Sequence, residues 1–134
     1  MTAVTTLFKK LRLDDSKRSL IINAPESFLS LCSDLAFDND YIHSEQGHYD
    51  FIMVFAIDQS NLEATVVRLA KAGITDCLFW ICYPKGSGKI KSNIKRDTAW
   101  YAFELIGFRP VTQIAIDDTW TGLRGRRLEL IKKL

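Results

Sequence analysis

Three runs of apolar residues mark the interior of the predicted fold. They occupy residues 19–23 (SLIIN), 49–57 (YDFIMVFAI) and 77–83 (CLFWICY). Runs of this length with almost no polar positions are typical of strands that are buried on both faces of a parallel sheet. We predict a strand at each run and place the strand over residues 75–83 at the centre of the sheet.

Apolar residues at helical spacing precede and follow the first run. Residues 2–13 have one apolar stripe with the basic residues away from it, which predicts a peripheral N-terminal helix. Residues 24–35 predict the next helix, because Pro25 is tolerated in a first helical turn. Residues 38–49 are polar and mixed, and we expect at most a short strand there, near residues 41–43.

Two further helices are predicted between the later strands. Ser60 and Glu63 have the spacing of a capping box that begins the earlier helix, and Gly73 would end it in the left-handed conformation. The later helix covers residues 93–106 and ends at Gly107.

The later helix has aromatic residues on two sides. The 100° step per residue gives one buried stripe: Ile94, Thr98, Tyr101, Ala102 and Leu105. Trp100 and Phe103 then point away from this stripe. Such residues indicate either cover by another element, such as the N-terminal helix, or an interface with a partner. We favour internal cover and keep the interface as the alternative.

The end of the chain predicts a hairpin. Residues 108–117 alternate apolar and polar side chains, and residues 120–128 can return as an antiparallel strand. The resulting order of strands and helices is that of a doubly wound α/β fold with three layers. We therefore expect one domain over residues 1–134, with a mostly parallel sheet, a C-terminal antiparallel hairpin strand and helices on both faces.

Composition supports a soluble cytoplasmic protein. No apolar run approaches the roughly 20 residues that span a bilayer, so no membrane association is expected. Cys32, Cys77 and Cys82 lie in apolar surroundings without a paired spacing, which favours buried reduced thiols. His43 and His48 lack a third strong ligand nearby, so we expect no metal site.

Basic residues are concentrated in two segments. Residues 85–96 contain five basic side chains and no acidic one, and residues 124–134 contain five basic side chains and one carboxylate. Two basic segments on an otherwise acidic domain indicate an anionic partner if they lie close together. The alternative is ordinary solvated surface charge.

Parallel strands end at one edge of a sheet, and open α/β folds bind ligands at that edge. We therefore predict an anion site after the first and central strands and at the start of the following helix. Its candidate residues are Asn23, Pro25, Glu26, Pro84, Lys85, Gly86, Ser87, Gly88, Lys89, Arg96 and Asp97. The segment is no Walker motif, because that motif needs glycine at Tyr83 and a hydroxyl at Ile90.

The strands YDFIMVFA and LFWICYPKG, with the closing hairpin, make the chain similar to class I S-adenosylmethionine-dependent methyltransferases. This resemblance implies a Rossmann-like sheet and a Gly-rich turn after the first strand. Here that turn reads Asn23, Ala24, Pro25, Glu26, and residues 1–46 contain no glycine. We therefore expect no cofactor, and S-adenosylmethionine is kept as the alternative.

The segments LIINAPESF, YPKGSGK, RDTAW and DDTWTGLR, in combination, resemble an uncharacterised bacterial family of short domains. That resemblance covers residues 7–127 and implies a methyltransferase-like sheet without a demonstrated activity.

We expect a non-catalytic binding or interaction module. Its partner would be an anionic small molecule or an acidic protein surface. A homodimer is also compatible with the sequence. Nucleic acid is not expected as a partner, since the sequence contains no recognised nucleic-acid-binding motif. Asp117 and Asp118 could act as an acid–base pair but are more typical of a hairpin turn. The alternatives are a methyltransferase with an atypical cofactor site and an oligomerisation protein that uses Trp100 and Phe103.

Overall fold

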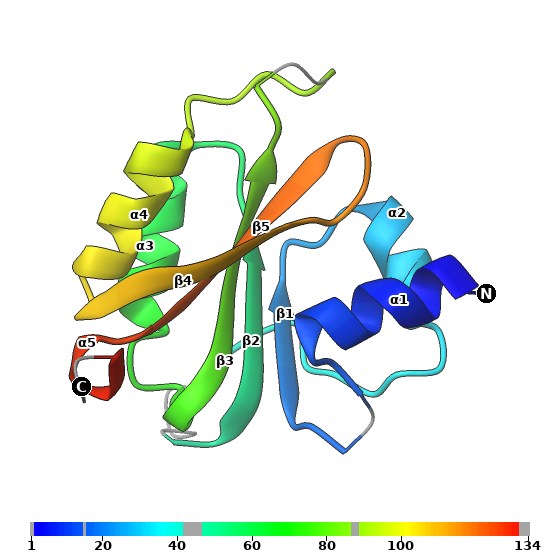
Figure 1. The fold of residues 1–134 in the computed structure, drawn as a ribbon, viewed down its shortest axis with the longest axis horizontal. Coiled ribbons are helices and arrows are strands. Elements are labelled where there is room, and N and C mark those ends of the chain that lie inside the picture. The colour runs from blue at the N-terminus through cyan, green and yellow to red at the C-terminus, as the bar shows by residue number, and fades with distance from the viewer. Residues whose placement is uncertain (1, 15, 42–46, 87–88, 132–134) are drawn as a thin grey trace.

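A five-stranded sheet forms the centre of the computed structural model, which describes residues 2–14, 16–41, 47–86 and 89–131 (Figure 1). Its strands are β1 (Ser19–Ile22), β2 (Tyr49–Phe55), β3 (Gly73–Pro84), β4 (Phe108–Ala115) and β5 (Trp120–Arg127). The helices are α1 (Thr2–Leu11), α2 (Glu26–Leu29), a 3-10 turn (Ser30–Cys32), α3 (Gln59–Arg68), α4 (Arg96–Glu104) and α5 (Leu128–Ile131).

The strand order is β1-β2-β3-β5-β4. β1, β2 and β3 are parallel, and β5 lies antiparallel between β3 and β4. The predicted fold class, a mostly parallel α/β sheet closed by an antiparallel strand, is therefore confirmed. The central position of β3 is also confirmed, and its residues 77–84 are buried.

Helices cover both faces of the sheet, as predicted. α3 and α4 pack on one face, and α1 and α2 lie on the other, on the side of β1 (Figure 1). The indole Nε1 of Trp80 donates a hydrogen bond of 3.1 Å to the carbonyl of Leu11, which fixes the end of α1 against β3. α1 therefore covers the face opposite to α4, and the predicted cover of α4 by the N-terminal helix is wrong.

The early helices differ in detail from the prediction. The helix expected over residues 24–35 is only α2 with its 3-10 turn, and Pro25 precedes it as the N-cap. α3 is capped by Asp58 and not by Ser60, because the Asp58 carboxylate accepts from the Asn61 N–H at 3.0 Å. Gly73 is no helix stop: it begins β3 opposite Tyr49.

α4 buries a different face from the one predicted. It begins at Arg96, three residues later than expected, and its buried residues are Ala99, Ala102 and Phe103. Tyr101 and Leu105, expected in the core, are 50% and 41% exposed. Gly107, at φ 77°, follows the helix and takes the left-handed stop that the sequence predicts there.

The segment before β2 runs beside the edge strand β1. Asp38 forms a parallel bridge with Leu20, in which the Ile21 N–H donates to the Asp38 carbonyl at 2.9 Å. Tyr41 is buried but lies outside any strand, and residues 42 and 43 of the predicted short strand fall outside the described residues.

Candidate functional site

The carboxyl ends of β1, β2 and β3 lie at one edge of the sheet because the three strands are parallel. The structure therefore brings the segments after β1 and β3 to the same edge, as the sequence predicts. Ser87 and Gly88 of the predicted site lie outside the described residues. We call this the carboxyl edge.

The basic segment that follows β3 is attached at both ends. The Lys85 N–H donates to the Thr119 carbonyl at 2.8 Å, which joins the segment to the turn between β4 and β5. At its other end, the Ser92 hydroxyl donates to the Ile57 carbonyl at 2.8 Å. The Asn93 side chain accepts from the Gln59 N–H at 2.7 Å. These bonds hold the segment across the carboxyl edge.

The N-terminus of α3, to which this segment is bonded, has two of its backbone donors occupied. Asp58 accepts from the Asn61 N–H and Asn93 accepts from the Gln59 N–H, so two of the N–H groups without a helical partner are already satisfied. This chain's own side chains therefore take up two of the donors that the α3 terminus would offer to an anion.

The basic side chains of the segment are unpaired within the described residues. Four are exposed and Lys85 is half-buried, and no ion pair joins any of them to a described carboxylate. They are Lys85, Lys89, Lys91, Lys95 and Arg96. Their charge is thus available to a ligand.

Arg96 and Asp97 are only partly placed as predicted. Both begin α4 near the phenol of Tyr83, whose pKa is raised chiefly by burial. Arg96 also lines a groove of about 180 Å³ between α4 and β4, together with Trp100 and Val111. Arg96 therefore belongs as much to this groove as to the carboxyl edge.

Phe103 is fully buried, which confirms the internal cover that we favoured for it, although it faces the sheet and not the N-terminal helix. Its ring meets Phe79 at 5.8 Å between centroids and stacks with Phe108 at 6.1 Å. The sheet itself covers Phe103, which is therefore not available as an interface residue. Trp100 is half-buried in the groove between α4 and β4.

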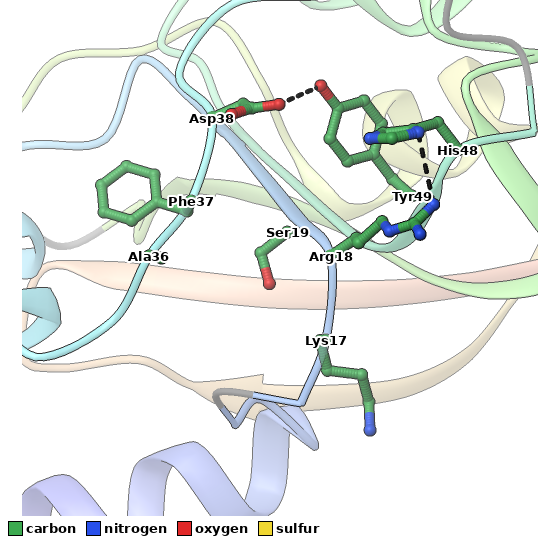
Figure 2. A pocket seen from close by; sticks show the side chains of 8 residues that line it. All are labelled: Lys17, Arg18, Ser19, Ala36, Phe37, Asp38, His48 and Tyr49. Carbon is green, nitrogen blue, oxygen red and sulfur yellow. Dashed lines mark hydrogen bonds between the residues drawn. The ribbon is translucent and has the colours of Figure 1, made fainter.

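A polar pocket lies at the opposite end of β1 and β2 (Figure 2), and only isolated polar residues mark it in the sequence. Its volume is about 280 Å³, and Lys17, Arg18 and Ser19 form part of its lining. The Ser19 hydroxyl is buried and has no hydrogen-bond partner among the described residues.

The acidic residue of this pocket is already engaged. The Tyr49 hydroxyl donates to the Asp38 carboxylate at 2.6 Å, as Figure 2 shows. Asp38 therefore lies near the amino ends of the strands, away from the carboxyl edge. Asp40 accepts from the Tyr41 N–H, and Glu45 lies outside the described residues.

The remaining candidate groups have structural roles. Burial raises the pKa of the Cys32 thiol to about 11 and that of Cys77 to about 12, so neither is a thiolate at neutral pH. The prediction that all three cysteines are buried is confirmed. Asp117 accepts from the Thr119 and Trp120 N–H groups at 2.8 Å, which makes it a turn residue.

The described residues offer neither a metal site nor a membrane-spanning helix. The described residues contain no group of three or more side chains suited to hold a metal ion, and His43 lies outside them. No described helix has the length and apolarity to cross a bilayer.

Solved structures with similar folds include S-adenosylmethionine-dependent methyltransferases and a [4+2]-cyclase. A S-adenosylmethionine-dependent methyltransferase from Aquifex aeolicus matches with a TM-score of 0.64 and 11% identity, over 91% of this chain and 88% of that one. Magnesium protoporphyrin IX methyltransferase from Synechocystis, solved with bound S-adenosylhomocysteine, matches with a TM-score of 0.60 and 12% identity, over 94% and 80%. The [4+2]-cyclase SpnF matches with a TM-score of 0.59 and 9% identity, over 94% and 80%.

No protein-family model and no curated protein sequence matches the chain. At these identities the structural matches establish the fold, which is that of the class I methyltransferases. Because a cyclase has the same fold, the fold alone does not assign the reaction.

The turn after β1 decides whether S-adenosylmethionine fits in the usual way. Asn23 adopts φ 60°, so the left-handed turn is made without glycine. Pro25 has no N–H to donate, and Glu26 places an exposed carboxylate in the first turn of a four-residue helix. These residues do not fit a cofactor that needs backbone donors for its own carboxylate.

Proposed function

We propose that this chain is a non-catalytic binding module on a methyltransferase-like fold, and that it binds an anionic ligand at the carboxyl edge. The observation that supports the proposal is the basic segment over residues 85–96. Its cations are unpaired among the described residues, and hydrogen bonds hold the segment at Lys85 and at Ser92. Residues that such bonds already hold lose less conformational entropy on binding than free ones.

The chemistry at this edge suits recognition better than catalysis. Lysine ammonium groups attract phosphate or carboxylate groups as point charges, and Gly86 is exposed with open space around it. The nearby carboxylates of Asp58 and Asp117 are already bonded to backbone N–H groups. The described residues at this edge thus offer cations, and these two carboxylates are not free to act as bases.

Thermal unfolding with a panel of anions tests the proposal. Phosphate or a nucleotide at a hundredfold excess over Kd should stabilise the protein by about 2.7 kcal/mol. The double variant Lys85→Ala/Lys89→Ala should lose most of this shift, whereas Lys71→Ala, an exposed lysine near the amino ends of the strands, should keep it. A panel that never raises the melting temperature of the unmodified chain would overturn the proposal.

The second candidate is a methyltransferase with an atypical cofactor site, which the shared fold favours. Calorimetry with S-adenosylmethionine and S-adenosylhomocysteine separates the two candidates. The misfit of Pro25 and Glu26 predicts millimolar or no binding of either compound. Micromolar binding, about 8 kcal/mol, would refute the non-catalytic module and support the enzyme.

A further inference from the structure

Three arginines lie together far from the carboxyl edge. Arg124 and Arg126 are two residues apart on β5 and therefore project from the same face of the sheet. Gly122 lies two residues before Arg124 and faces the same side, where a Cβ atom on it would lie 3.3 Å from the Trp80 ring. Trp80 in turn is hydrogen-bonded to the end of α1, so this is the face of the sheet that α1 covers. Figure 1 shows α1 and α2 on the side of β1.

Arg124 is only half exposed and lacks a partner. It lies opposite Trp80 on β3 and opposite Thr112 on β4. Its Nε atom is buried and has no hydrogen-bond partner among the described residues. Burial, and then the charges of Arg12 and Arg126, lower the pKa of the Arg124 guanidinium. A cation in such surroundings favours an anion beside it.

Arg12 reaches this position through an unusual helix end. The bond from Trp80 to the Leu11 carbonyl fixes the end of α1 beside the strand that pairs with Arg124. The N–H of Arg12 donates to Lys9 and that of Leu13 to Phe8, so Arg12 occupies the position that usually holds glycine. Arg12 has φ 61°, which is unfavourable for a residue with a side chain.

Asp76 orients the third guanidinium. Its two carboxylate oxygens accept from Nε and Nη2 of Arg126, each at 2.9 Å. Asp76 also has φ 61°, so two of the three described non-glycine residues with positive φ belong to this cluster. Among the described residues, the ion pair of the cluster is the one between Asp76 and Arg126, and no described carboxylate forms an ion pair with Arg12 or Arg124.

We propose that Arg12, Arg124 and Arg126 form a binding site for the phosphate group of a small molecule. The guanidinium groups of Arg12 and Arg124 can each match a pair of phosphate oxygens, and Arg126, whose Nε and Nη2 are bonded to Asp76, adds charge and its remaining N–H groups. A dianion would compensate the charge that Asp76 leaves. Three guanidinium groups gathered over one strand suit one compact anion, whereas a nucleic acid would need a stripe of cations. Asp76 acts as a positioning residue that holds the fork of Arg126.

This site is separate from the proposed function. Asp76 lies in the first part of β3, whereas Lys85 follows the last residue of that strand. The double variant at Lys85 and Lys89 should therefore leave phosphate binding at the arginine cluster unchanged, so the two proposals can fail independently.

Titration calorimetry of the full chain with inorganic phosphate and with a nucleoside monophosphate tests the site. Arg12→Gly and Arg124→Leu should each weaken binding at least about tenfold, whereas Lys10→Ala, which removes an exposed charge from the same helix, should change Kd less than about twofold. Arg12→Gly should not lower the melting temperature without phosphate, since glycine suits that backbone.

Three results would overturn the site. The first is that the unmodified chain binds neither phosphate compound at millimolar concentration. The second is that Arg12→Gly and Lys10→Ala lose the same affinity for phosphate. The third is that the chain binds a single-stranded oligonucleotide but neither phosphate compound. If Arg124→Leu does not fold, the difference in phosphate affinity between Arg12→Gly and Lys10→Ala still shows whether the arginine cluster binds phosphate.

Discussion

At the scale of single residues, Phe103 has the most demanding position in the core. Its ring packs with Phe79 and Phe108, and a Cβ atom at Gly125 would lie only 2.6 Å from it. Glycine is therefore required on β5 because the Phe103 ring occupies the space above the strand.

Phe103→Ala should reduce the free energy of unfolding by about 3–5 kcal/mol, because it removes a fully buried ring and leaves a cavity. Tyr101→Ala is the matched control on the same helix. Its side chain is 50% exposed, and the change should stay within about 0.5 kcal/mol. Urea denaturation of both variants measures the difference. Equal losses would show that α4 does not pack on the sheet as described.

At the scale of elements, the strands were predictable and the helix faces were not. The apolar runs of β1, β2 and β3 are so uniform that no other element suits them, and each was placed within a few residues. Ile94, the first residue of the predicted stripe, lies before α4 begins at Arg96, so it does not mark a face of that helix. The face that meets the sheet is formed by Ala99, Ala102 and Phe103, while Tyr101 of the predicted stripe is exposed.

The start of a helix was also hard to predict from the sequence alone. Ser60 and Glu63 match a capping box by spacing alone, but Asp58 is the residue with the extended backbone that a cap requires. Two suitable side chains compete for the start of α3, and the strand that precedes the helix decides between them. Tertiary contacts such as the bond from Asn93 to Gln59 cannot be seen in the local pattern.

One candidate site could be predicted from the sequence and two could not. The carboxyl edge follows from strand direction and was predictable, whereas the pocket at Ser19 and the arginine cluster depend on contacts between distant segments. The charge pattern did mark residues 124–134 as basic. It gave no sign that Arg12, more than a hundred positions earlier, would join Arg124.

At the scale of the whole molecule, β3 connects two basic regions that face different surroundings. Asp76, in its first part, contacts the arginine cluster, and Lys85 continues from its end into the carboxyl edge. Sites that share no partner usually contribute independently to stability and binding. Their separation can therefore be tested by combining the two sets of variants.

Phosphate stabilisation should be additive across the two regions. Arg12→Gly should remove the phosphate stabilisation that comes from the arginine cluster. Lys85→Ala/Lys89→Ala should remove the phosphate stabilisation that comes from the carboxyl edge. The combined variant should lose the sum of both within about 0.5 kcal/mol, as measured by the phosphate-induced change in the free energy of unfolding. A combined loss much smaller than the sum would mean that one ligand contacts both regions. β3 would then be a rigid connection between two parts of a single extended site.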